Sequence, residues 1–213
     1  MAQLLENRAI DHIVLSVPNL EEGVRWLETL TGVTATFGGY HPTKGTKNAL
    51  VNIGNQCYLG ILTTDVENQS IEAPRWMGVD LIQSPTITRW SLKSTDLVQD
   101  SKILNTYQSD LGTIEGGQRK TSNGQVLAWE MIVPLAEPAV DILPFMTDWQ
   151  QSDIHPTDSL PVQGELVHLK LSHPTPDTLQ PVFDELNVDL VVEKAAIPTI
   201  HLVLETAKGR VMI

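Results

Sequence analysis

Three similar strand-like phrases each carry one chemically capable side chain at a comparable place. They read DHIVLSV at residues 11–17, TRWSLKS at 88–94 and LVHLKLS at 166–172, and they place His12, Arg89 and His168 near their starts. A neutral imidazole can accept a proton or ligate a metal ion, whereas a guanidinium is a fixed cation with donors only. The phrases therefore predict equivalent backbone positions with unequal chemistry.

A glycine-bearing loop, HPTKGTKN at residues 41–48, holds a second group of candidates. His41, two lysines and the backbone amides of this loop could meet an anionic ligand. Asn48 could point at a ligand or cap the strand that follows. The loop lacks the fixed glycines and terminal Lys-Ser/Thr of a phosphate-binding P-loop. A solvent-exposed connection between strands is the alternative interpretation.

A third group follows the expected final strand of the second repeat, where Trp149 and His155 lie close to Asp148. A loop at this place could fold over a cleft, and an indole beside an imidazole would suit an aromatic or polar small molecule. Trp149 could instead plug the open end of a curved sheet, because tryptophan is more often buried for packing than exposed to a ligand.

The elements that must position these residues form βαβββ units. In the first unit Ile13, Leu15 and Val17 alternate with polar residues, Pro18 ends the strand, and Asn19 is expected to cap a helix that Gly32 closes. Short strands are expected at 34–37, 49–53 and 57–62. The second unit predicts a helix at 96–111 and strands at 113–119, 126–133 and 142–146, with a hairpin turn at Asn123-Gly124. The third predicts a helix from about 177 to 186 and strands at 189–193, 200–205 and 211–213.

The sequence thus predicts an α+β fold in which repeated βαβββ modules form a strongly curved mixed sheet or half-barrel with helices on the outer face. Modules at about 10–63 and 86–149 are expected to pair within one region, 1–149. A polar, proline-bearing linker at 150–163 precedes a third module at 164–213, packed on the same domain. That odd module should cover an edge, extend the sheet or pair in a homodimer.

Charge and composition limit the classes of binding partner that this protein is expected to have. The formal net charge of −12 argues against nucleic acid, which needs a basic surface, and against anionic membranes. No stretch approaches about 20 consecutive apolar residues, and residues 1–8 lack the apolar run of a signal peptide. The single Cys57 fits a reducing compartment. A cytoplasmic protein with a small-molecule ligand is expected.

Several of these stretches together resemble a glyoxalase-like domain of the vicinal-oxygen-chelate superfamily, which includes bleomycin-resistance proteins and dioxygenases. They are DHIVLSVPNL at 11–20, GYHPTKGTKNAL at 39–50, YLGIL at 58–62, LPFMTDW at 143–149 with His155-Pro156, and LVHL at 166–169. The resemblance implies a divalent metal ion held by His12 and by the position of Gly60, where many relatives have glutamate. Glycine offers no ligand atom, and Arg89 would repel a metal at the matching place, so the implied metal site is incomplete.

Two functions follow from the resemblance and stay open. One is a lyase, isomerase or dioxygenase-type enzyme acting in the cleft. The other is a non-catalytic protein that binds or sequesters a small molecule, as bleomycin-resistance relatives do, and Gly60 and Arg89 favour this one or a metal-free enzyme. The expected ligand-binding residues are His12, His41, Asn48, Arg89, Trp149 and His155.

Overall fold

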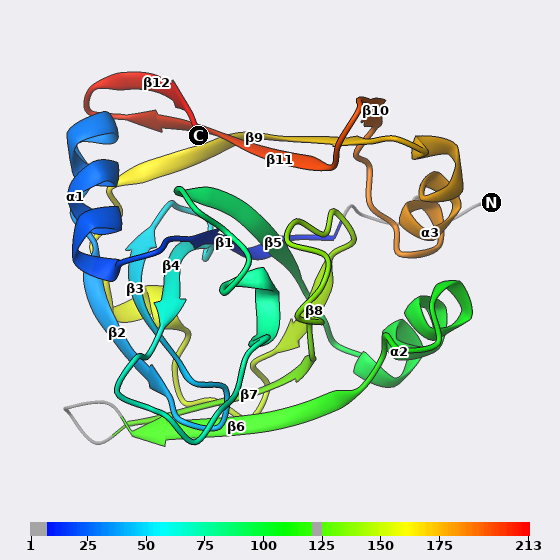
Figure 1. The fold of residues 1–213 in the computed structure, drawn as a ribbon, viewed down its shortest axis with the longest axis horizontal. Coiled ribbons are helices and arrows are strands. Elements are labelled where there is room, and N and C mark those ends of the chain that lie inside the picture. Colours follow the sequence, from blue (N-terminus) through cyan, green and yellow to red (C-terminus); the bar gives the residue numbers. More distant parts are fainter. Residues whose placement is uncertain (1–7, 121–124) are drawn as a thin grey trace.

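A computed structural model describes residues 8–120 and 125–213 (Figure 1). The first unit folds as a strand, a helix and three strands: β1 (Ile10–Ser16), α1 (Leu20–Thr31), β2 (Thr36–His41), β3 (Thr46–Asn52) and β4 (Tyr58–Thr64). The second repeats this order: β5 (Thr86–Lys93), α2 (Leu97–Tyr107), β6 (Ile114–Lys120), β7 (Val126–Ile132) and β8 (Phe145–Asp148). The expected turn at Asn123-Gly124 lies outside the described residues.

Local chemistry explains where α1 begins and ends. The Asn19 side chain accepts a hydrogen bond of 3.0 Å from the backbone N–H of Glu22, and Gly32 adopts φ 77° at the other end, as expected. Gly23 lets the helix approach the strand, since a Cβ there would lie 2.6 Å from a Val17 methyl carbon. The helix thereby seals its apolar face against the sheet.

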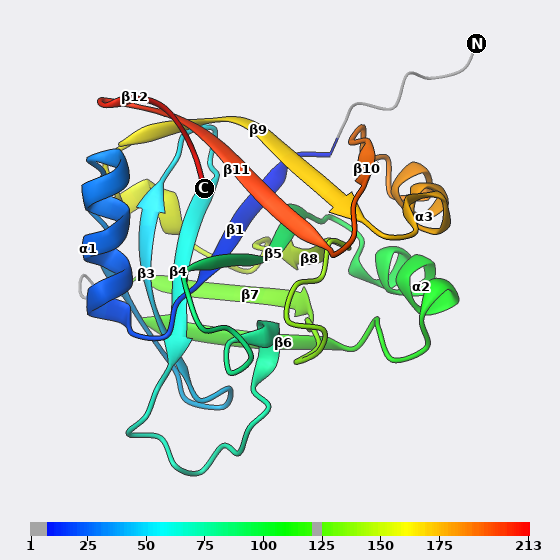
Figure 2. The ribbon, with the colours of Figure 1, turned by 45° about the horizontal axis from the view of Figure 1, so that its top comes forward.

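The first two units join into one curled sheet of eight strands, ordered β2-β3-β4-β1-β5-β8-β7-β6. In each unit the first strand pairs in parallel with the last, β1 with β4 and β5 with β8, and β1 joins β5 antiparallel. The sheet curls into a half-barrel with α1 and α2 outside it (Figures 1 and 2), which confirms the predicted fold class.

Alternation along β1 divides the protein into a packed side and a hollow side. Ile13 and Leu15 join the main hydrophobic core on the helical side. His12 and Val14 face the concave side, where they line a cavity. The period of two that assigns these faces is a property of any extended strand.

The third unit is built differently from the other two. Its elements are β9 (Gly164–His173), α3 (Gln180–Glu185), β10 (Val192–Lys194), β11 (Thr199–Thr206) and β12 (Gly209–Met212), and its sheet is ordered β10-β9-β11-β12. Here the first strand pairs in parallel with the strand directly after the six-residue helix α3. The third unit thus has the same order of elements along the chain as the first two units, but a different order of strands in its sheet.

This second sheet packs on the convex side of the first and extends from α1 to α3 (Figures 1 and 2). Leu169, Leu202 and Leu204 share one core with Ile13 and Leu15. The unit therefore covers a face of the first sheet, and neither covers its edge nor extends it, which were two of the three expected arrangements, because its alternating leucines need an apolar surface to bury against. Association into a homodimer remains a prediction that sedimentation at high concentration would test.

The segment between the second and third units runs back along the first. Its short 3₁₀ turn η2 (Pro156–Ser159) is followed by a parallel bridge between Asn52 and Val162. The Asn52 side chain donates to the carbonyl oxygens of Thr157 and Leu160 at 3.1 and 3.0 Å. None of the helices in the described ranges is long and apolar enough to cross a membrane.

Candidate functional site

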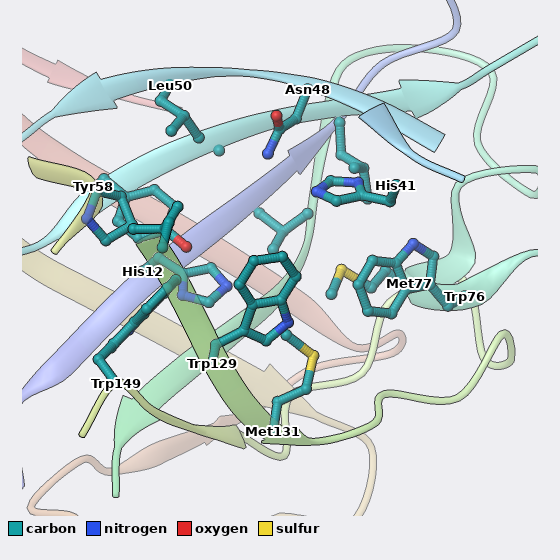
Figure 3. Close-up of a pocket in the computed structure, with 15 residues that line it drawn as sticks. His12, His41, Asn48, Leu50, Tyr58, Trp76, Met77, Trp129, Met131 and Trp149 are labelled. Atoms are coloured by element: carbon teal, nitrogen blue, oxygen red, sulfur yellow. The ribbon is translucent and has the colours of Figure 1, made fainter. Parts of the chain in front are cut away.

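The concave side of the half-barrel holds a cavity of about 650 Å³, its open mouth included (Figure 3). Strands from both units contribute to its walls, which are largely aromatic, aliphatic and thioether. The lining residues are His12, Val14, His41, Asn48, Leu50, Tyr58, Gly60, Leu62, Trp76, Met77, Leu127, Trp129, Met131, Trp149 and Pro156. Among these described residues no Asp, Glu, Lys or Arg side chain lines the cavity.

The long connection between β4 and β5 supplies one wall through Trp76 and Met77, which lie in the 3₁₀ turn η1 (Trp76–Gly78). The Met77 backbone N–H donates to the Leu135 carbonyl oxygen at 3.1 Å, and the Trp76 indole donates to Thr46 Oγ1 at 3.1 Å. Met77 has φ 60°, a left-handed conformation rare for a residue with a side chain. These tertiary bonds hold the conformation that carries Met77 into the cavity.

A charged pair spans the two ends of the curled sheet beside Trp76. Lys44 Nζ, from the β2–β3 hairpin, lies 2.7 Å from a carboxylate oxygen of Glu115 on β6 and 5.5 Å from the centre of the Trp76 ring. The pair thus joins opposite edges of the half-barrel at the side of the cavity.

Behind His12, a fully buried carboxylate gathers three aromatic donors. Asp11 Oδ1 lies 2.6 Å from His12 Nδ1, and its Oδ2 lies 2.9 Å from Trp149 Nε1 and 3.3 Å from His155 Nε2. Burial alone would raise the pKa of Asp11, but the hydrogen bonds to His12 and His155 and the electrostatic attraction of these two rings outweigh it and hold the pKa at about 2. The carboxylate is therefore ionised at neutral pH and accepts from all three rings.

His155 has both ring nitrogens committed to structure. Its Nδ1 accepts from the Thr157 backbone N–H at 3.3 Å and lies 2.7 Å from the Thr157 hydroxyl. A nitrogen that accepts from a backbone N–H carries no proton, so the ring proton is on Nε2 and is donated to Asp11. His155 thus supports the site from behind the cavity wall and is not among its lining residues.

The ring of His12 is held on two sides. It stacks on Tyr58 with centroids 4.6 Å apart and planes 10° from parallel, and it meets Phe145 edge-on at 5.1 Å. His12 lines the cavity together with Tyr58 and Trp129 (Figure 3). Fixed packing and a fixed hydrogen bond together leave this ring one orientation.

His41 and Asn48 lie on the wall opposite His12 (Figure 3). His41 Nδ1 is 3.0 Å from Thr46 Oγ1, and its ring meets Trp76 edge-on at 5.7 Å. The Asn48 Oδ1 atom is buried without a hydrogen bond, so this amide has capacity left for a ligand or a water molecule.

The structure does not bring Arg89 to the cavity. Its buried guanidinium donates to the carbonyl oxygens of Thr88, Leu135, Pro138 and Ala139 at 2.7–3.1 Å. Burial lowers its pKa to about 10 despite the opposing charge of the nearby Asp141 carboxylate. Arg89 thereby fastens the loop before β8 onto the sheet.

Of the other expected residues, His12, His41, Asn48 and Trp149 line one cavity, and His155 lies just behind it. His168 is exposed on the outer sheet, so the three opening phrases do not share one site. Sequence reasoning missed Asp11 and the β7 residues Leu127, Trp129 and Met131. The period-two spacing of these β7 residues is the signal that could have placed them on one face.

The residues present do not fit a metal ion of the kind that the resemblance implies. Within residues 8–120 and 125–213, no group of three or more His, Cys, Asp or Glu side chains could hold one. Gly60 lines the cavity, and a Cβ built there would meet its neighbours at 3.8 Å or more, so a side chain could begin there without a clash but the glycine itself offers no ligand atom. His12 alone is not a donor set.

Comparisons with known proteins agree with the fold. Residues 10–187 match the glyoxalase-like domain family. A crystal structure of a hypothetical protein from Staphylococcus aureus shares 16% identity and a TM-score of 0.66, over 94% of this chain and 92% of that one. This likeness extends the shared fold to nearly the whole chain. No curated protein sequence matches significantly.

Two more distant structures are methylmalonyl-CoA epimerases. The Streptomyces coelicolor enzyme, in complex with 2-nitronate-propionyl-CoA, is 15% identical over 68% of this chain and 98% of its own, with a TM-score of 0.41. The Mycobacterium tuberculosis enzyme is 15% identical over 69% of this chain and 93% of its own, with the same score. At this level of similarity neither bears on the chemistry of the cavity.

Proposed function

We propose that this chain, which belongs to the glyoxalase-like domain family, binds a small, uncharged aromatic molecule in the cavity on its concave side, without a metal ion. The observation that carries the proposal is the composition of the cavity wall. Small-molecule sites are concave and mostly apolar, with a few polar groups that fix orientation. Three indoles, one phenol ring and two thioethers here surround His12, His41 and Asn48 (Figure 3).

The absence of charged Asp, Glu, Lys and Arg side chains from the described lining selects against ionic ligands. A ligand carboxylate or ammonium that enters an apolar wall loses its hydration, and a side chain of opposite charge would have to replace it. Aromatic ligands gain instead, because Trp129 and Trp149 offer ring surfaces 6.0 Å apart, centroid to centroid, and tilted by 55°.

Calorimetry and ligand-observed NMR with phenol and indole test the proposal. Molecules of this size bind with affinities on the order of millimolar, so both methods suit them. We expect Trp129→Leu to weaken binding about tenfold, because it removes ring surface from the wall. Trp26→Leu is the matched control, since Trp26 lies on α1 outside the cavity. Equal affinities of the two variants would refute the location, and no binding to the native protein would refute the function.

A metal assay tests the second part of the proposal. Protein purified without chelator should hold no stoichiometric metal ion, and Zn²⁺, Ni²⁺, Mn²⁺ or Fe²⁺ should leave phenol affinity unchanged. Stoichiometric metal that disappears in His12→Ala would refute metal-free binding.

Lyase or isomerase chemistry is a second candidate, favoured by one observation. His12 is an imidazole oriented by a buried carboxylate, and histidine is the commonest general acid or base. If a ligand from the binding screen is converted, His12→Gln should abolish the conversion even at ligand concentrations that saturate the variant. Conversion that persists in His12→Gln would remove His12 from any catalytic role.

A further inference from the structure

We propose that Asp11 fixes His12 with its proton on Nδ1, so that the cavity presents Nε2 as a hydrogen-bond acceptor and selects ligands that carry an O–H or N–H donor, such as phenols. The inference rests on the proposed function, because it assumes that the cavity binds small aromatic molecules. It goes further by assigning a specificity-determining atom and the residue that positions it.

The first step is the state of the Asp11–His12 hydrogen bond. Asp11 Oδ1 and His12 Nδ1 are 2.6 Å apart, and an ionised carboxylate has lone pairs and no proton to give. The proton between the two atoms therefore belongs to Nδ1. In a neutral imidazole, Nε2 then carries the lone pair.

The second step is that Asp11 cannot rearrange. Its other oxygen accepts from Trp149 Nε1, which is always a donor. The same oxygen accepts from His155 Nε2, whose proton is fixed there because His155 Nδ1 accepts from the Thr157 backbone. Both carboxylate oxygens thus face donors, and rotation of the carboxylate would leave the proton on His12 Nδ1.

The third step is that Nε2 faces the cavity and is available to a ligand. His12 lines the cavity, and across the described part of the chain no side chain or backbone group hydrogen-bonds this nitrogen. The groups packed around the ring are Tyr58 on its face and Phe145 at its edge. A ligand without a donor would leave Nε2 unpaired among these rings, whereas a phenol hydroxyl would satisfy it.

An Asp11→Asn substitution should reverse which nitrogen of His12 carries the proton. The asparagine oxygen must accept from Trp149 and His155, because neither can give up its proton. The asparagine NH₂ group is then directed at His12 Nδ1, which has to accept. The proton of His12 moves to Nε2, and the cavity presents a donor in place of an acceptor.

Three small molecules of similar size, phenol, toluene and benzaldehyde, can detect the change of His12 Nε2 from acceptor to donor. Phenol offers a donor, toluene offers neither donor nor acceptor, and benzaldehyde offers an acceptor only. The ratio of phenol to benzaldehyde affinity should fall on the order of 10- to 100-fold from the native protein to Asp11→Asn. Toluene affinity should change little, and the exposed Asp110→Asn should behave like the native protein.

The outcomes separate this inference from the proposed function. If none of the probes binds the native protein, the proposed function is wrong. If the probes bind but the phenol-to-benzaldehyde ratio is the same in Asp11→Asn, only the assignment of Asp11 and His12 is wrong.

A second measurement needs no variant and guards against misfolding of Asp11→Asn. The ¹⁵N shifts of the ligand-free native protein at about pH 8 distinguish the two neutral tautomers of His12 and its imidazolium form. We expect the Nδ1–H tautomer. The Nε2–H tautomer, or a ring protonated on both nitrogens at this pH, would overturn the inference.

Discussion

The buried Asp11 carboxylate should make the stability of this protein depend on pH in a way that one substitution removes. Asp11→Asn keeps the shape of the side chain but deletes its charge. The carboxyl pKa is about 2 in the folded protein against an ordinary 3.8. At about 1.4 kcal/mol for each pKa unit, this difference corresponds to roughly 2 kcal/mol of stability at neutral pH.

The sign follows from the direction of the shift. Because folding lowers the pKa of Asp11, its contribution is fully present above about pH 4, where the carboxyl is ionised in the unfolded chain as well. It is lost as pH falls from there through about 2, and roughly half should remain at about pH 3. Protonated Asp11 resembles asparagine, so the native protein and Asp11→Asn should converge in acid.

Urea unfolding at several pH values between about 7 and 3 measures this. We expect Asp11→Asn to lower the free energy of unfolding by roughly 2 kcal/mol at neutral pH and by about half as much at pH 3. Asp110→Asn makes the same chemical change at an exposed residue and should cost well under 1 kcal/mol. A deficit for Asp11→Asn that stays constant with pH, or that equals the Asp110→Asn value, would show that the three ring donors do not stabilise the carboxylate.

Three further predictions concern residues away from this carboxylate. Arg89→Met should lower the free energy of unfolding by roughly 2–5 kcal/mol in urea, because four carbonyl oxygens lose their donor; a cost below 1 kcal/mol would contradict the role of Arg89 as a loop clamp. Gly60→Ala should raise the free energy of unfolding by roughly 0.5–1 kcal/mol, and with it the melting temperature, since the added Cβ meets nothing closer than 3.8 Å. Gly117→Ala should lower the melting temperature, because its Cβ would lie 2.5 Å from a Trp129 ring carbon. The reverse order of the two melting temperatures would refute the packing described around these glycines. Burial raises the pKa of the Cys57 thiol to about 12, so Ellman's reagent should label Cys57 only after unfolding, and rapid labelling of the native protein would contradict its burial.

Much of the fold follows from short-range patterns in the sequence. Asn19 and Gly32 mark the ends of α1, and alternation along residues 10–16 assigns His12 to the hollow side and Ile13 to the packed side. The repeat of this pattern at β5 predicts a paired half-barrel, which the structure has. Such patterns are readable because a helix cap or a strand period involves only residues a few positions apart.

The third unit departs from the pattern of the first two. Its order of elements equals that of the first two units, yet β9 pairs with β10 and β11, and the sheet lies on a face of the half-barrel. The place of this sheet depends on which apolar surface the rest of the chain leaves uncovered, and that surface is not visible in the local pattern of residues 164–213.

The sequence by itself determined the class of fold, the first two units, and the placement of His12 on the concave side. Only the tertiary structure decided what His12 can do. Asp11 accepts hydrogen bonds from Trp149 and His155, which lie 138 and 144 residues away in the sequence. The guanidinium of Arg89 donates to carbonyl groups that include one 50 residues away. Hydrogen bonds form between whichever groups folding brings within about 3 Å, so the tautomer of a histidine and the availability of an arginine are properties of the assembled core rather than of any segment.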